Sequence, residues 1–381
     1  MRIPLAKPDI TAREKEYVLD VLNSDILGLG PRMQLFEQLV ADYVGCDYAV
    51  ACNSGTSGLH MLVRALGLQD GDEVITTPFS FIASSNCLLF ERAKPVFVDI
   101  DERTYNLDVT QIESKITERT KAILPVHVFG QPADMTEIMR IAKKYDLFVI
   151  EDACEAIGAK WLGQQAGTIG DAGVFAFYPN KQLTTGEGGI IVTNNTRLAE
   201  QCRSLRNQGR DLDAAWLSHV QLGFNYRLDE MSAALGIAQM ERVDDMLERR
   251  QQLARMYMDK LYGTPGVILP FVDPRAHISW FVFVIRFLDS ELRDRVMQQL
   301  IRKGIGCRPY FSPIHLQPFY REQFGYAPGD YPVTEFVASG TMAIPFYNRL
   351  QECEMDEVVA TIRDVLRNFS SAGEGEGKWR L

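Results

Sequence analysis

The 381-residue chain lacks most of the features that mark secreted, membrane-spanning or metal-binding proteins. Its seven cysteines are scattered without close pairs, which is typical of free thiols in a reducing compartment. The five histidines show no metal-ligand spacing, so we expect no metal site. No signal peptide is apparent, and no apolar run approaches the roughly 20 residues of a membrane span. We therefore expect a soluble, cytoplasmic protein.

Positive charge is also in short supply. Lysine and arginine total 40 against 50 acidic residues, which gives a formal net charge of −10. This balance gives no reason to expect nucleic acid or an anionic membrane as a partner. A hydrophobic content of 46% and a charged content of 24% are ordinary for a globular enzyme, and the length suits a large domain plus a smaller one.

The hydrophobic pattern predicts an α/β fold. Strand-like runs alternate with amphipathic helical patterns from about residue 35 to residue 195, which indicates a mostly parallel sheet with helices on both faces. A long polar helix is predicted over about 229–261, a type of helix that suits a bridge between domains. A strand at 280–285 and a last helix through 358–369 favour a separate α+β unit.

This pattern predicts how the chain divides into domains. We expect a large cofactor-binding domain at 1–250 with 1–27 packed on it, a small α+β domain at 251–369, and a disordered tail at 370–381. No internal repeat is apparent.

Lys181 is the most informative residue, because it lies on a short turn between two buried strand-like runs and ahead of the Gly-rich segment 186–189. An amine in a partly desolvated pocket loses its proton more readily and becomes a nucleophile that condenses with an aldehyde. Pyridoxal phosphate is the aldehyde cofactor that uses lysine in this way. An exposed loop lysine is the alternative, so other segments must decide.

A carboxylate and an anion site support the cofactor interpretation. The predicted strand 147–150 leads into Asp152, at the end of the sheet where open α/β proteins bind ligands. A carboxylate there keeps a pyridine nitrogen protonated, although a helix cap is an alternative for Asp152 alone. The turn 53–58 joins a predicted strand to a helix and presents backbone N–H groups suited to a phosphate. It lacks the Gly-Lys-Ser/Thr of ATP-binding loops.

Aromatic residues follow another predicted strand. Phe79 and Phe81 lie just after 74–77, and one of them is placed to stack on a flat cofactor ring. Core packing explains a phenylalanine at this point equally well.

These motifs occur with several others in one order along the chain. The segments are 3–10, 27–31, 53–57, 77–83, 95–101, 126–131, 151–153, 175–189, 223–227, 308–311 and 313–317. In this order the chain resembles the nucleotide-sugar aminotransferases of the DegT/StrS type, which have fold type I of the pyridoxal-phosphate enzymes. The resemblance covers nearly the whole chain.

The resemblance implies roles for individual residues. Lys181 matches the lysine that binds the cofactor and moves the proton, and Asp152 matches the carboxylate beneath the pyridine nitrogen. The implied cofactor-binding residues are Gly55, Thr56, Ser57, Phe81, Asp152, Glu155, Lys181 and Asn225. Asn225 matches an asparagine that reaches the phosphate from the neighbouring subunit, which implies a homodimer with shared sites. The substrate residues implied or suggested by charge are Tyr310, His315 and Arg227, with Arg206 and Arg210 as further candidates for an anionic substrate.

Two positions depart from the common pattern of this family. Glu155 stands where a glutamine near the ring oxygen of the cofactor is frequent, and its charge would repel that oxygen unless a proton is shared. Ala176 replaces a frequent phosphate-binding serine, whose hydroxyl must then be replaced by Tyr178, Asn180 or water.

The resemblance implies transfer of an amino group from L-glutamate to a keto-sugar nucleotide, for polysaccharide or secondary-metabolite synthesis. One alternative is other chemistry on the same scaffold, such as sugar dehydration or a non-sugar amination. Some relatives that dehydrate sugars carry histidine in place of the lysine, so Lys181 argues against dehydration. A second alternative is a non-catalytic, cofactor-binding regulatory protein.

Overall fold

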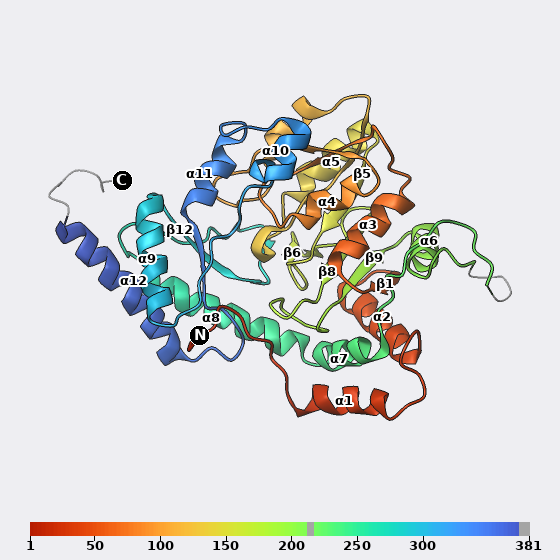
Figure 1. Ribbon diagram of the computed structural model, residues 1–381, viewed down its shortest axis with the longest axis horizontal. Helices are drawn as coiled ribbons and strands as arrows, with labels where there is room; N and C mark the ends of the chain where they lie inside the picture. The colour runs from red at the N-terminus through yellow and green to blue at the C-terminus, as the bar shows by residue number, and fades with distance from the viewer. Residues whose placement is uncertain (212–216, 373–381) are drawn as a thin grey trace.

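The computed structural model describes residues 1–211 and 217–372, and its centre is a seven-stranded sheet (Figure 1). The strands, in spatial order, are β1 (Tyr48–Cys52), β9 (Gly189–Thr193), β8 (Ala172–Ala176), β5 (Phe148–Asp152), β4 (Thr120–Ile123), β2 (Glu73–Thr76) and β3 (Lys94–Phe97). All pairings are parallel except those of β9, which runs antiparallel to both β1 and β8. The predicted α/β fold with a mostly parallel sheet is confirmed.

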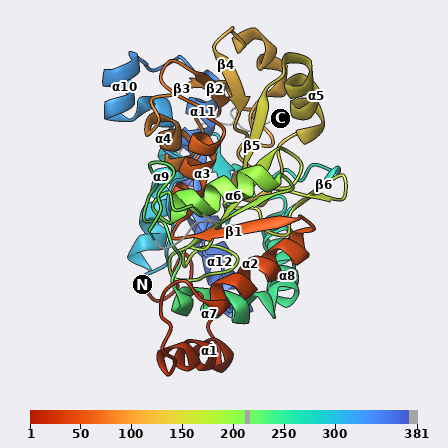
Figure 2. The ribbon, with the colours of Figure 1, turned by 90° about the vertical axis from the view of Figure 1, so that its right-hand side faces the viewer.

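Helices cover both faces of this sheet because its strands are apolar on both sides. On one face, Val50 and Val174 pack with α3 (Gly55–Ala65) and α6 (Thr196–Arg206). On the other, alternate residues such as Ala51 pack with α2 (Pro31–Val44). Figure 2 shows β1 between α6 and α2. The remaining helices around this sheet are α1 (Ala12–Leu22), α4 (Ala83–Leu89), α5 (Met135–Tyr145) and α7 (Glu230–Met240).

The C-terminal part has its own hydrophobic core around a three-stranded sheet. Its strands and helices are β10 (Val267–Ile268), β12 (Phe283–Phe287), β13 (Thr341–Ile344), α9 (Ser290–Arg302), α10 (Pro318–Phe324), α11 (Pro332–Gly340) and α12 (Glu352–Ala372). A small third sheet contains β11 (Ala276–His277), β6 (Lys160–Trp161) and β7 (Gln164–Gln165). Short 3-10 helices lie at Val109–Gln111, Glu113–Lys115, Val128–Gly130 and Ile314–Leu316.

The long polar helix predicted over 229–261 is two helices. α7 ends at Met240 and α8 (Val243–Leu261) begins after Arg242, whose backbone leaves helical geometry at φ −123° and ψ 13°. Val243 and Met246 at the start of α8 pack with the large sheet, whereas Leu253 and Tyr257 pack in the C-terminal core. α8 therefore runs from one core to the other, and the domain division near residue 250 stays a prediction.

Both ends of the chain differ from the simplest expectation. α1 packs against α7, and Leu5 packs against the core of the large sheet. Ile3, in contrast, pairs with Ile305 and is buried in the C-terminal core, so the segment 1–27 contacts both parts. α12 continues to Ala372, so 370–372 are helical and not a disordered tail; 373–381 lie outside the described residues. Among the described residues, no helix is both long and apolar enough to cross a bilayer, and no His/Cys/Asp/Glu cluster suits a metal ion.

Candidate active site

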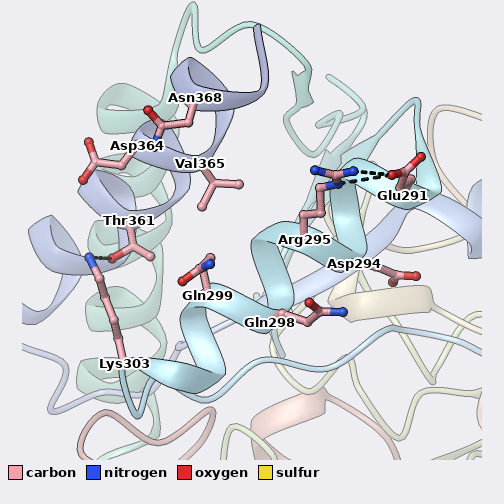
Figure 3. A pocket seen from close by; sticks show the side chains of 10 residues that line it. All are labelled: Glu291, Asp294, Arg295, Gln298, Gln299, Lys303, Thr361, Asp364, Val365 and Asn368. Carbon is pink, nitrogen blue, oxygen red and sulfur yellow. Dashed lines mark hydrogen bonds and ion pairs between the residues drawn. The ribbon is translucent and has the colours of Figure 1, made fainter. Parts of the chain in front are cut away.

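A cavity of about 590 Å³ lies at the carboxyl ends of β5 and β8. It is lined by most of the predicted cofactor residues: Gly55, Thr56, Phe81, Asp152, Glu155 and Lys181. A larger open hollow of about 790 Å³ lies between α9 and α12 (Figure 3). Its wall consists mostly of polar surface side chains, such as the Arg295–Glu291 ion pair, and includes none of the predicted site residues. The smaller cavity therefore holds the groups predicted to carry the chemistry.

Lys181 enters this cavity from the turn that follows β8. Its backbone N–H donates to the carbonyl of Tyr178 at 2.9 Å, which closes the turn. Its side chain is 14% exposed, and Nζ lies 3.4 Å from Oε1 of Glu155. The ring centre of Phe281 lies 4.0 Å from Nζ, a distance at which a cation is attracted to the ring face. The amine is thus held by a carboxylate and an aromatic ring.

Asp152 forms the floor of the cavity at the end of β5. Its side chain accepts two hydrogen bonds, one from the Ser84 hydroxyl at 2.6 Å and one from the Cys154 N–H at 3.1 Å. The residue is only 5% exposed. Each carboxylate oxygen offers two acceptor positions, so capacity remains for a further donor in the cavity.

Glu155 is the second buried carboxylate of the cavity. Burial raises its pKa, and the positive charge of Lys181 partly opposes this rise. Its Oε2 accepts the N–H of Phe129 at 2.9 Å. A raised pKa means that Glu155 takes up a proton more readily than an exposed glutamate does, as required if this residue is to lie beside an anionic oxygen.

The first turn of α3 forms another part of the wall. Ser54 caps the helix by accepting the N–H of Ser57 at 3.1 Å, and Gly55 and Thr56 line the cavity. A Cβ on Gly55 would lie 2.8 Å from Ala176 Cβ, so glycine is required by this close approach. Ser57 is buried behind the wall, with its hydroxyl donating to Asn53.

The two phenylalanines that follow β2 lie in different places, one in the lining of the cavity and one in the hydrophobic core. Phe81 lines the cavity and is 62% exposed, whereas Phe79 is fully buried in the core. Ala176 also lines the cavity, together with Tyr178 and Asn180, the two residues expected to compensate for its missing hydroxyl. Phe81, the phenylalanine implied by the family resemblance, therefore presents an open aromatic face to the cavity, and Phe79 does not.

Among the predicted substrate residues, Tyr310 lines the cavity, and burial raises its pKa to about 12. Arg227 does not line it; its Nη1 donates to Asn207 at 3.1 Å. Arg206 is buried against Glu37 and the carbonyl of Ala51, so it has a structural role.

The expectation that His315 lines the substrate pocket is corrected by the structure. Its imidazole is fully buried, and its Nε2 lies 3.0 Å from Glu335 Oε1. The ring packs edge-on against Tyr331, and the neighbouring N–H of Ile314 donates to the carbonyl of Pro78 at 2.8 Å. His315 is therefore not among the lining residues of the cavity.

Asn225 lies outside the cavity of its own chain. Asn225 is exposed, and its backbone carbonyl accepts a hydrogen bond from the side-chain amide of Asn53 at 3.5 Å. This position neither requires nor opposes the predicted reach into a neighbouring subunit, which stays a prediction.

Sequence reasoning missed several lining residues, among them Ser84, Glu187, Phe281 and Arg308. Phe281 and Arg308 come from the C-terminal part, far along the chain from Lys181. Arg308 belonged to a motif recognised in the sequence, but nothing local indicated that it faces the same cavity as Lys181.

The profile of the DegT/DnrJ/EryC1/StrS aminotransferase family matches residues 8–363. The chain belongs to this family. It is 40% identical over 369 residues to the GDP-perosamine synthase of Caulobacter vibrioides, covering 96% of this chain and 98% of that protein. The crystal structure of DesV from S. venezuelae in complex with a ketimine intermediate is 35% identical, with a TM-score of 0.88 over 93% of this chain and 94% of that one.

A further similar structure is the PLP form of Spr1654 from Streptococcus pneumoniae. It is 26% identical, with a TM-score of 0.91, and covers 96% of this chain and 99% of that one. The predicted family and aminotransferase class are confirmed, and relatives with this fold bind pyridoxal phosphate.

Proposed function

We propose that the protein uses pyridoxal phosphate to transfer an amino group from L-glutamate to a keto-sugar linked to a nucleoside diphosphate. The observation that carries the proposal is the meeting of Lys181 and Asp152 in one cavity, at the end of the sheet. The similarity to a GDP-perosamine synthase supports a sugar nucleotide as the acceptor.

The residues present fit this cofactor. Asp152 has acceptor capacity for a pyridinium N–H, and the first turn of α3 offers amides to a phosphate. Phe81 offers an open ring face, and Lys181 offers the amine. When bound, the cofactor supplies an electron sink that stabilises a carbanion at the amino-bearing carbon.

The chain itself then supplies positioning and proton transfer. Lys181 acts as nucleophile and as the general acid–base, since its Nζ is the only amine that lines the cavity among the described residues. Asp152 would hold the pyridinium N–H of the bound cofactor and so would keep a positive charge on its ring. Glu155 Oε1 lies 3.4 Å from Nζ, so an ionised Glu155 is placed to balance the positive charge of the protonated amine.

Arg308 is the cavity cation best placed for an anionic substrate. It lines the cavity, its residue is exposed, and its Nη1 donates to the carbonyl of Cys307 at 2.9 Å. Among the described residues no carboxylate forms an ion pair with it, whereas Lys181 is paired with Glu155. A guanidinium with free donors binds carboxylates and phosphates in a two-pronged geometry. We assign Arg308 to an oxyanion of the substrate.

A homodimer with shared active sites is part of the proposal. Large apolar side chains are exposed along the N-terminal segment, namely Leu19, Leu22, Ile26, Leu27 and Leu29. Exposed apolar residues gathered on one segment favour a protein–protein contact. Asn225 is exposed and available to a neighbouring copy.

The proposal is tested by trapping the cofactor on the chain and by product analysis. Borohydride treatment of the protein with pyridoxal phosphate is expected to add mass to the peptide bearing Lys181. Lys181→Ala is expected to fold and to lose turnover, whereas Lys160→Ala, which removes an exposed lysine on β6, keeps both. Full activity in Lys181→Ala would refute the proposal.

Keto-sugar nucleotides incubated with L-glutamate are expected to gain nitrogen in the product, as read by mass spectrometry. A product that loses water without gaining nitrogen would indicate sugar dehydration. An adduct on Lys181 without amino transfer from any donor would indicate the regulatory alternative.

A further inference from the structure

Arg250 is a buried cation next to the candidate active site that sequence motifs do not indicate. It lies on α8 and is only 3% exposed. Among the described residues no carboxylate lies within 4.0 Å of its guanidinium, although buried charges are normally paired. Burial lowers its pKa to about 10, so the group stays charged at neutral pH. Such a residue needs another source of stabilisation.

Backbone carbonyls provide that stabilisation. Nη1 donates to the carbonyl of Trp280 at 3.1 Å and to that of Phe281 at 3.2 Å. Nη2 donates to the carbonyl of Lys181 at 3.3 Å. One guanidinium therefore joins α8, the turn bearing Lys181 and the segment before β12, which come from three separate parts of the chain.

These bonds fix Lys181 in two ways. The bond from Nη2 holds the backbone carbonyl of Lys181 itself. The bond to Phe281 acts on the side chain of Lys181, because the ring of Phe281 lies 4.0 Å from Lys181 Nζ. Trp280, which carries one of the bonded carbonyls, has a φ of +51°, a conformation that a bulky residue keeps only when its surroundings fix it.

We propose that Arg250 is a positioning residue that sets the place of the Lys181 amine by anchoring both its turn and the Phe281 ring. The role of the amine rests on the proposed function, but the anchoring itself does not require the cofactor. Because α8 contributes to both hydrophobic cores, the same contact ties the place of the amine to the seating of the C-terminal part.

The preceding residue offers a matched control. Arg249 also lies on α8 and also donates to carbonyls, to Asn348 at 3.2 Å and to Leu350 at 3.1 Å. Neither acceptor lies in the segments that carry Lys181 or Phe281. Arg249→Met and Arg250→Met therefore both remove arginine–carbonyl bonds from one helix, but only the second removes bonds to the Lys181 turn.

The first measurement uses the full chain without added cofactor. Competitive acetylation followed by mass spectrometry gives the reaction rate of Lys181 relative to the exposed Lys160 in the same sample. We expect Arg250→Met to change this ratio by about 10-fold or more, and Arg249→Met to leave it within about 2-fold. Equal ratios in the two variants would overturn the proposal, whatever their melting temperatures.

The second measurement uses the protein with pyridoxal phosphate. The circular dichroism of the bound cofactor depends on a fixed geometry, so we expect a weakened band in Arg250→Met, an intact band in Arg249→Met and partial recovery in Arg250→Lys. An intact band in Arg250→Met would also overturn the proposal. If Arg250→Met does not fold, Arg250→Lys and Phe281→Leu replace it, and an unchanged acetylation ratio in both counts against the proposal.

The two proposals fail separately. A wild-type protein that forms no adduct with pyridoxal phosphate removes the proposed function, while the acetylation ratio still decides the role of Arg250. An unchanged ratio with a normal adduct removes the role of Arg250 alone.

Discussion

The last two residues of β5 carry carboxylates that lie in different environments on the two faces of the sheet. Glu151 and Asp152 are consecutive carboxylates, and both are buried. Glu151 accepts four hydrogen bonds, from the backbone N–H groups of Gly167, Ile169 and Gly170 at 2.6–2.7 Å and from His127 at 2.8 Å. Asp152 accepts two, and it lines the cavity.

The difference follows from the strand itself. Successive side chains of a strand point to opposite faces, so two neighbouring acids are delivered to different environments. The Glu151 side meets a loop whose amides fill the acceptor positions of the carboxylate. The Nδ1 of His127 accepts the N–H of Ala133, so its Nε2 carries the proton given to Glu151. A saturated carboxylate holds the fold together, whereas one with spare capacity beside a cavity is available for chemistry.

The contrast between Glu151 and Asp152 would fail most clearly if Asp152 proved to be needed for stability and not for activity. Asp152→Asn is expected to lower the rate of amino transfer by at least about 100-fold, since a neutral pyridine is a poorer electron sink and each tenfold loss is about 1.4 kcal/mol. Its melting temperature is expected to stay close to that of the wild type. Steady-state kinetics and thermal unfolding measure the two effects; a stable variant with nearly full activity would contradict the assignment.

The converse substitution sharpens the comparison from the other side. In Glu151→Gln an amide NH₂ faces backbone N–H donors, so about two hydrogen bonds to a charged group are lost, and we expect a loss of about 3 kcal/mol in unfolding free energy. Activity measured well below the melting temperature is expected to remain within a few-fold. Chemical denaturation measures the loss in unfolding free energy. A large kinetic defect in a fully stable variant would show that Glu151 is not structural.

A third carboxylate tests the effect of burial through pH. Because the pKa of Glu155 is raised in the folded chain, its contribution to stability is greatest below the ordinary glutamate pKa and is lost as pH rises through the folded value. Glu155→Gln carries no such proton. The variant without cofactor is therefore expected to gain melting temperature relative to the wild type from pH 4 to pH 8. A difference that is constant across this range would exclude the raised pKa.

The smallest effect is expected at His315. The buried imidazole bonds to Glu335 and does not line the cavity, so His315→Asn is expected to leave KM for the sugar nucleotide within about two-fold while costing about 1 kcal/mol of stability. Tyr310→Phe, at a lining residue, is the matched comparison. A large rise in KM for His315→Asn alone would restore the sequence-based expectation.

Much of the site was readable from the chain because its parts lie in local signals. Asp152 follows a buried apolar run, the turn at 53–58 lies between a strand and a helix, and Lys181 precedes a Gly-rich segment. Each signal is set by neighbours within a few residues, so periodicity and turn chemistry suffice to find it. The break between α7 and α8 was missed because Glu241 and Arg242 are ordinary helix formers by composition.

The sequence by itself determined the alternation of strands and helices and membership of an aminotransferase family, and it singled out Lys181 and Asp152 as the candidate nucleophile and candidate acid. Only the tertiary structure decided that His315 is buried outside the cavity lining, that the Phe281 ring lies beside the Lys181 amine, and that Arg250 reaches the carbonyl of Lys181. The physical reason is that these outcomes depend on contacts between segments distant along the chain. Local pattern specifies which face of an element is apolar, but not which distant atom will fill the remaining space.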